Sequence, residues 1–128
     1  MADAENVITK TADFLKWYLP KAGKMPRDFK FLFGESIIRL QLDLLENLTA
    51  AYYSPKSSKE KLRCLGSANL QIETLRQLLR ISTDLQWLSL PQFEFATREL
   101  NAIGGMVGGW LRHSRLGAGG NSSDVPGE

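Results

Sequence analysis

Apolar residues recur at steps of three or four along four segments of the chain, and strand-like alternation is not sustained anywhere. A recurrence with the period of an α-helix predicts helices that each have an apolar face. We expect these helices over about residues 6–21, 27–53, 57 or 58 to 90, and 92–115. Pro20, Pro26, Pro55 and Pro91 mark their ends, because proline is disfavoured inside a helix and restricts the residue before it.

Short connections between the segments predict that neighbouring helices run antiparallel. The expected fold is therefore all-α, an up-down-up-down four-helix bundle that occupies residues 1–116. Residues 117–128 are mostly Gly, Ser and other polar residues, a composition that predicts a disordered C-terminal tail. The predicted core includes Phe33, Ile37, Leu40, Leu44, Ile72, Leu75, Leu79, Leu100, Ile103 and Val107.

The third predicted helix has a second apolar stripe beside the one that faces the core. Its members are Leu78, Ile81, Leu85 and Leu88, which are also spaced by three and four residues. A surface helix normally needs one such stripe. The second stripe indicates either a helix packed on several sides within the bundle or contact with another chain. We predict a subunit interface.

The fourth predicted helix contains Gly104, Gly105, Gly108 and Gly109. Each glycine inside a helix costs roughly 1 kcal/mol relative to alanine, yet the apolar spacing continues through this stretch. Gly105 and Gly109 lie one turn apart, so they share a face that a neighbouring helix can approach closely. We assign both to the predicted oligomer interface. The alternative is that the helix ends at Gly104.

Composition fits a globular domain, with 43% apolar residues and a single cysteine, Cys64. One cysteine excludes a disulfide within the chain, which fits a reducing compartment. No apolar run is long enough to span a bilayer, and the acidic N-terminus does not resemble a signal peptide. We expect a cytoplasmic protein without a membrane role.

Residues suited to catalysis are sparse. His113 is the only histidine, and we interpret it as a solvated residue near a helix end. Without a second histidine or thiol, neither a metal site nor a Ser-His-Asp or Cys-His arrangement is indicated. The glycines of the fourth helix do not follow a strand, so they do not predict a phosphate-binding loop. We expect no catalytic residue, no metal, no cofactor and no small-molecule substrate.

Basic residues gather at the ends of the predicted helices. The chain has 16 Lys and Arg against 14 Asp and Glu, and two of the acids lie in the tail, so the bundle has a net charge of about +4. The fourth helix should end at the pole where the third begins. This pole then combines Lys56, Lys59, Lys61, Arg63, Arg112 and Arg115.

Other cations lie elsewhere on the predicted bundle. Arg27 belongs to a cluster around the first turn, and Arg76 and Arg80 lie one turn apart on the third helix. Exposed cations often form nothing more than a solvated face. The alternative is a surface that binds a polyanion or a protein partner. We predict such a surface, with Arg76 and Arg80 as its most specific part.

Three motifs together resemble the Avd-like four-helix bundle proteins, named after the accessory variability determinant of diversity-generating retroelements. The first is Met25-Pro26-Arg27 followed by Phe31-Leu32-Phe33-Gly34. The second is Leu75-Arg76-Gln77-Leu78-Leu79-Arg80, with its two arginines one turn apart. The third is the closing Gly108-Gly109-Trp110-Leu111. The resemblance covers about residues 10–115.

The resemblance implies a homopentameric barrel of four-helix bundles with a positively charged surface. It also implies association with a reverse transcriptase and its template RNA, or with DNA, in support of mutagenic cDNA synthesis. The polymerase chemistry then belongs to the partner. A second hypothesis is an oligomeric four-helix scaffold with protein partners only, similar to the ribosomal-RNA intervening-sequence proteins.

Overall fold

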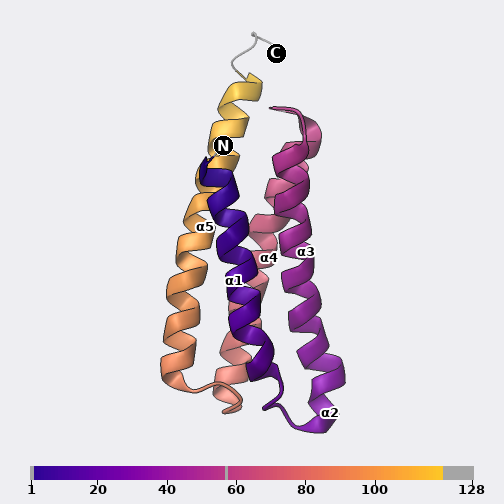
Figure 1. The fold of residues 1–128 in the computed structure, drawn as a ribbon, viewed down its shortest axis with the longest axis vertical. Helices are drawn as coiled ribbons and strands as arrows, with labels where there is room; N and C mark the ends of the chain where they lie inside the picture. The colour runs from indigo at the N-terminus through magenta and orange to yellow at the C-terminus, as the bar shows by residue number, and fades with distance from the viewer. Residues whose placement is uncertain (1, 57, 120–128) are drawn as a thin grey trace.

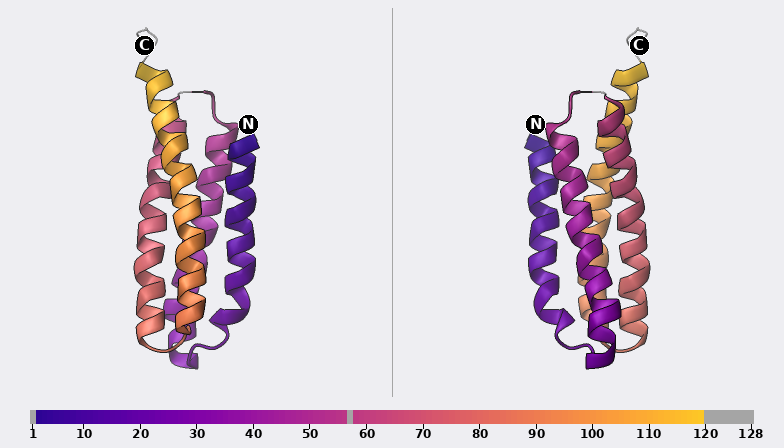
Figure 2. Two further views of the ribbon diagram at one scale, coloured as in Figure 1. Left: turned by 90° about the vertical axis from the view of Figure 1, so that its left-hand side faces the viewer. Right: turned by 90° about the vertical axis from the view of Figure 1, so that its right-hand side faces the viewer.

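The computed structural model describes residues 2–56 and 58–119, which form helices and short connections. The four long helices are α1 (Ala2–Ala22), α3 (Glu35–Tyr53), α4 (Lys59–Asp84) and α5 (Leu90–Gly119). They lie side by side and alternate in direction (Figures 1 and 2). The predicted all-α bundle of four antiparallel helices is confirmed.

Each long helix has its main contacts with two neighbours, so the order around the bundle is α1, α3, α4, α5. Polar side chains link each neighbouring pair at the edge of the apolar core. The links are Tyr52 Oη to Glu5 Oε2 (3.2 Å), Asn47 Nδ2 to Gln71 Oε1 (3.1 Å), Arg76 Nη1 to Asn101 Oδ1 (2.6 Å) and Lys10 Nζ to Glu99 Oε1 (3.9 Å).

The core lies along the bundle axis and contains most of the predicted residues. Phe33 and Leu40 are only partly buried and pack against its surface, whereas the other eight predicted residues are buried. Helix α1 adds Val7, Phe14 and Tyr18 to the core. None of the described helices combines the length and the apolar character needed to cross a membrane.

The segment predicted as one helix over 27–53 begins with two short elements. Helix α2 (Arg27–Phe29) leads into a π-helical turn, η1 (Lys30–Gly34), which continues directly into α3. A Cβ on Gly34 would lie 3.2 Å from the Met25 sulfur. Glycine at this position therefore lets buried Met25 pack closely where the chain enters α3.

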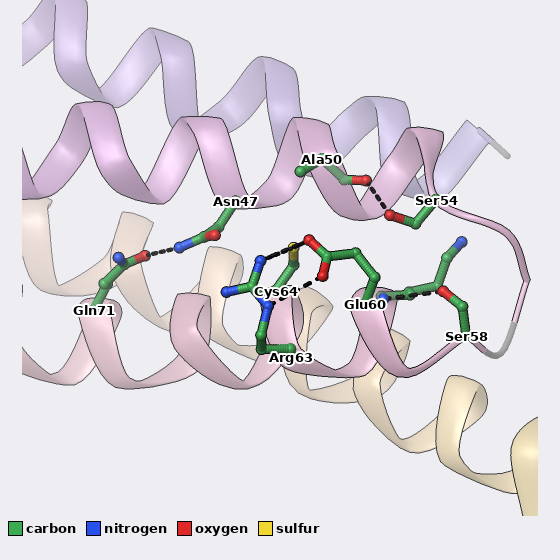
Figure 3. Close-up of polar contacts among 9 residues, drawn as sticks. Asn47, Ala50, Ser54, Ser58, Glu60, Arg63, Cys64 and Gln71 are labelled. Atoms are coloured by element: carbon green, nitrogen blue, oxygen red, sulfur yellow. Dashed lines mark hydrogen bonds and ion pairs between the residues drawn. The ribbon is translucent and has the colours of Figure 1, made fainter.

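Helix α4 begins at a capping serine. Ser58 is the N-cap, and its hydroxyl accepts a hydrogen bond from the backbone N–H of Lys61 at 3.1 Å (Figure 3). Ser57, which has capping-box spacing to Glu60, lies outside the described residues. Glu60 instead binds Arg63, one turn further along the helix.

Helix α4 ends at Asp84, before the predicted end next to Pro91. The N–H of Gln86 donates to Thr83 O (2.9 Å) and the N–H of Trp87 donates to Ser82 O (2.8 Å). These two bonds form a Schellman motif, with Gln86 at a positive φ of 67°. The apolar spacing predicted a longer helix because buried Leu88 has helical spacing but lies in the turn.

Helix α5 is longer than predicted. It starts at Leu90, so Pro91 lies in the first turn, where a missing N–H is tolerated. It then continues through all four glycines, and the alternative of an end at Gly104 is wrong. Its last residue, Gly119, lies within the predicted tail 117–128, and the remaining residues of that tail are outside the described ones.

Candidate partner and nucleic-acid interface

Arg76 lies in the seam between α4 and α5 and donates hydrogen bonds to both helices. Its Nε is 3.2 Å from Glu73 Oε2, its Nη1 is 2.6 Å from Asn101 Oδ1, and its Nη2 is 3.4 Å from the Leu100 carbonyl oxygen. The side chain stays 27% exposed. Arg76 therefore holds α4 against α5 and still presents an edge of its guanidinium to solvent.

Gly104 makes room for this contact. A Cβ at position 104 would lie 3.3 Å from Nη2 of Arg76 and 3.7 Å from Cγ2 of Ile72. Its absence lets the guanidinium lie close to the backbone of α5. The approaching group at Gly104 belongs to the same chain.

Arg80 lies one turn beyond Arg76 and is exposed. The ion pairs found among the described residues involve other cations, namely Lys10, Lys16, Arg63 and Arg76. Both arginines line a hollow of about 180 Å³ over α5, together with Phe93 and Thr97. Two arginine side chains therefore lie beside one hollow, and guanidinium groups favour bidentate binding of carboxylate or phosphate.

Helix α4 begins and α5 ends at the same end of the bundle (Figure 2), where the sequence predicts a basic pole. Lys61 Nζ lies 5.7 Å from the centre of the Trp110 ring, a cation–π contact between the two helices. The exposed cations at this pole are Lys56, Lys59, Arg63, Arg112 and Arg115. The structure thus brings together all six residues that the sequence assigned to one pole.

Arg63 is the only one of these six in an ion pair found among the described residues. Its Nη2 and Nε donate to Glu60 at 2.6 and 3.2 Å (Figure 3). This bond holds the pKa of the Glu60 carboxyl below its ordinary value. Burial raises the pKa of the adjacent Cys64 thiol, which donates to Glu60 at 3.5 Å. Arg63 is therefore partly neutralised, whereas the ion pairs of the described residues include none of the other five cations of this pole.

Arg27 lies at the opposite end of the bundle, in α2. It is exposed and flanks Phe29, whose ring stacks on Trp87. The structure therefore separates the predicted cations into three groups: the α4–α5 seam, the basic pole, and the end that contains α2.

The comparison of the sequence with known families matches the bAvd-like family over residues 7–114. The chain belongs to the bAvd-like family. No curated protein and no solved structure matches it. The matched region of this bAvd-like protein includes all of α3 and α4, most of α1 and α5, and the arginine pair of the seam.

The predicted interface stripe of the bAvd-like bundle is split by the turn after α4. Ile81 and Leu85 are 42% and 52% exposed. Leu78 is partly buried against the core, and Leu88 is 3% exposed and belongs to the core. Within one subunit, Ile81 and Leu85 are therefore the members of the stripe that have the most surface for a second chain.

Gly105 and Gly109 face a different part of the bAvd-like bundle, between α1 and α5. They line a groove of about 510 Å³ with Ala4, Met106 and Trp110. A Cβ on Gly105 would meet nothing within 4 Å. This groove is open to a neighbouring element, whereas Gly104 and the Arg76 seam lie on the α4 side of α5.

Sequence reasoning missed the contacts that fix Arg76. Asn101 Oδ1 and the Leu100 carbonyl accept from it, although they lie about 25 residues away in the chain. The sequence does contain Gly104, which leaves room for Arg76. The two can be matched only once the register of α4 against α5 is known.

Proposed function

We propose that this chain is a non-catalytic accessory subunit of a diversity-generating retroelement. In this proposal it binds the reverse transcriptase and the template RNA and supports mutagenic cDNA synthesis. The observation that favours it most is the pair Arg76 and Arg80 over one hollow, in a chain of the bAvd-like family.

The arginine pair suits a carboxylate or phosphate of the partner. Arg76 is already held in place by Asn101 and Glu73, so little side-chain entropy is lost when a ligand binds. Arg80 is exposed, and the ion pairs found among the described residues do not include it. A preorganised arginine next to an adaptable one favours a specific contact over general attraction of anions.

The basic pole supplies a weaker, less specific attraction for nucleic acid. Its exposed cations lie on the connection before α4, on α4 and on α5, and only Arg63 among them is in an ion pair of the described residues. Binding through such groups should fall steeply with salt, because each neutralised phosphate releases counterions.

We further propose a homo-oligomer, with a pentamer expected from the family resemblance. Ile81 and Leu85, at and just beyond the end of α4, form one surface of the subunit, and the groove of Gly105 and Gly109 beside α1 is another. Contact between two different surfaces generates a ring when the rotation closes. Sedimentation or light scattering gives the subunit number directly.

The decisive experiment uses Arg80→Ala, because Arg80 is exposed and its loss should leave the bundle intact. Arg39→Ala on α3 is the matched control, an exposed arginine away from the seam. We expect Arg80→Ala to keep the oligomer mass and to reduce co-purification with the reverse transcriptase and cDNA synthesis at least tenfold.

Arg76→Ala adds a second test, since it removes both the exposed part of this side chain and its hydrogen bonds to Asn101 and Leu100 on α5. We expect it to lower stability as well as binding. If Arg80→Ala binds the reverse transcriptase as well as Arg39→Ala does, the arginine pair is not the docking site. A chain that assembles fully but binds neither reverse transcriptase nor RNA would instead support the scaffold with protein partners only.

A further inference from the structure

The turn between α4 and α5 holds a strained residue in a position where glycine is usual. Gln86 is the non-glycine residue found at positive φ among the described residues, at 67°. It occupies the C′ position of the Schellman motif, which glycine most often fills because it has no Cβ penalty. A glutamine that persists in such a conformation points to a role for its side chain.

The Gln86 side chain lines a pocket of about 390 Å³ at this end of the bundle. Lys24 comes from the α1–α2 connection, and Trp87 and Ser89 come from the turn itself. Gln92, on the first turn of α5, exchanges hydrogen bonds with Ser89 at 2.9 and 3.2 Å. The pocket therefore combines an indole ring, an ammonium group and amide groups.

An aromatic cluster adjoins the pocket. The rings of Phe29 and Trp87 lie 5.2 Å apart at 38°, and Phe33 meets Trp87 edge-on at 5.8 Å. Phe29 remains 50% exposed. Phe29 therefore leaves part of its side chain open for contact with a flat ring.

Cations and acids both lie around this cluster. Lys24, Arg27 and Lys30 are exposed, and none of the ion pairs of the described residues includes them. The exposed acids at this end of the bundle are Asp28, Glu35, Asp84 and Glu94. The three cations outside these ion pairs can meet the phosphates of a ligand.

We propose that this end of the molecule binds single-stranded RNA, with a base against Trp87 and Phe29. We call it the turn-end site and define it by Lys24, Phe29, Gln86 and Trp87, with Arg27 and Lys30 as flanking cations. It rests on the proposed function, because it locates an RNA contact for the same protein. The site lies away from Arg76 and Arg80.

Each group of the turn-end site fits a part of a nucleotide. Aromatic rings stack on bases of any sequence, the Gln86 amide offers both a donor and an acceptor to a base edge, and the cations meet phosphates. A duplex does not expose base faces for stacking. The site should therefore prefer unpaired RNA, as in loops and single strands.

The test measures binding of labelled single-stranded homopolymers of uridine and adenosine, and of an RNA duplex, to the full chain by fluorescence anisotropy. Gln86→Gly is the main variant. It should raise the melting temperature, because glycine accepts a positive φ, and it should weaken single-strand binding several-fold, because the amide is gone. A residue with only a structural role would not show opposite changes in stability and affinity.

Two further variants have matched controls. Phe29→Ala should weaken single-strand binding about tenfold through lost stacking. Its control, Phe31→Ala, removes another exposed ring that lines a separate hollow on α3 and should bind as the wild type does. Lys24→Gln should reduce the slope of log affinity against log salt by about 1. Its control is Lys16→Gln, on exposed α1 surface beside Asp13.

Several results would overturn the turn-end site. One is unchanged single-strand binding in both Gln86→Gly and Phe29→Ala, and another is equal affinity for duplex and single strands. If the wild-type chain binds the reverse transcriptase but no RNA homopolymer, this inference fails while the docking role of Arg80 stands. We expect the two sites to be separate. Arg80→Ala should then lose binding of the reverse transcriptase but keep binding of single-stranded RNA, whereas Gln86→Gly should lose binding of single-stranded RNA.

Discussion

The hydroxyl group of Tyr18 gives the sharpest stability prediction. Tyr18 is 1% exposed, and its Oη has no hydrogen-bond partner among the described residues. Burying a hydroxyl without a partner costs about 1–3 kcal/mol. Phenylalanine keeps the ring and its packing while removing this group. We therefore expect Tyr18→Phe to stabilise the protein by about 1 kcal/mol, after allowance for the small space the hydroxyl leaves.

The assay is urea or thermal unfolding followed by circular dichroism. A gain of about 1 kcal/mol corresponds to a rise in melting temperature of roughly 4 °C for a chain of this size. The matched control is Tyr52→Phe. The Tyr52 hydroxyl donates to Glu5 Oε2 at 3.2 Å, so its removal should lower stability slightly or leave it unchanged.

Alkaline pH tests the same hydroxyl independently. Burial raises the pKa of Tyr18 from 10.0 to about 12. The fold therefore favours the neutral phenol, while the unfolded chain ionises at the ordinary pKa. The part of the free energy of unfolding that depends on the neutral Tyr18 phenol is present in full below pH 10, and it is lost as the pH rises to about 12. Tyr18→Phe should lack this loss.

Two results would refute the reasoning. If Tyr18→Phe is less stable than the wild type by 1 kcal/mol or more, the hydroxyl has a hydrogen-bond partner in solution. If the Tyr18 phenol titrates near 10 in the folded protein, it is not buried as the structure has it.

Gly105→Ala should stabilise the folded subunit by about 1 kcal/mol, because an added Cβ meets nothing within 4 Å. Gly104→Ala should gain less, since its Cβ would lie 3.3 Å from Nη2 of Arg76, and thermal melts of both variants compare them. An equal gain at the two positions would contradict the close approach of Arg76. Ser58→Ala removes the N-cap of α4 and should lower the free energy of unfolding by about 1 kcal/mol, measured by urea titration. Ser54→Ala, at the end of α3, leaves that cap in place and is its control; equal losses in the two variants would mean that the Ser58 cap contributes little.

Helix number and most of the core followed from periodicity, and helix direction followed from the short connections. Residues such as Ile37, Ile72 and Leu100 repeat with the helical period, and burial of a helix face depends on this local pattern. The same reasoning misplaced the end of α4, because Leu85 and Leu88 continue the spacing. The backbone bonds of Gln86 and Trp87 stop the helix, and a glutamine at positive φ gives no sequence signal of a turn.

The candidate site also combines features that the sequence predicted with contacts that it did not predict. The one-turn spacing of Arg76 and Arg80 was visible in the sequence, because one helix places both on a common face. The hydrogen bond from Arg76 to Asn101 was not visible in the sequence, since it depends on the register of α4 against α5. The turn-end site likewise joins Lys24 and Phe29 to Trp87, which lies about 60 residues further along the chain.

The sequence by itself therefore determined this protein's helices, its apolar core and its cation-rich segments, because these depend on residues close together in the chain. Only the tertiary structure decided which groups meet. It anchored Arg76 and left Arg80 exposed, and it buried Leu88 in the subunit's own core. It also brought an indole ring, an amide and a lysine to one pocket. Such meetings depend on the register and packing of neighbouring helices, which many weak contacts set together.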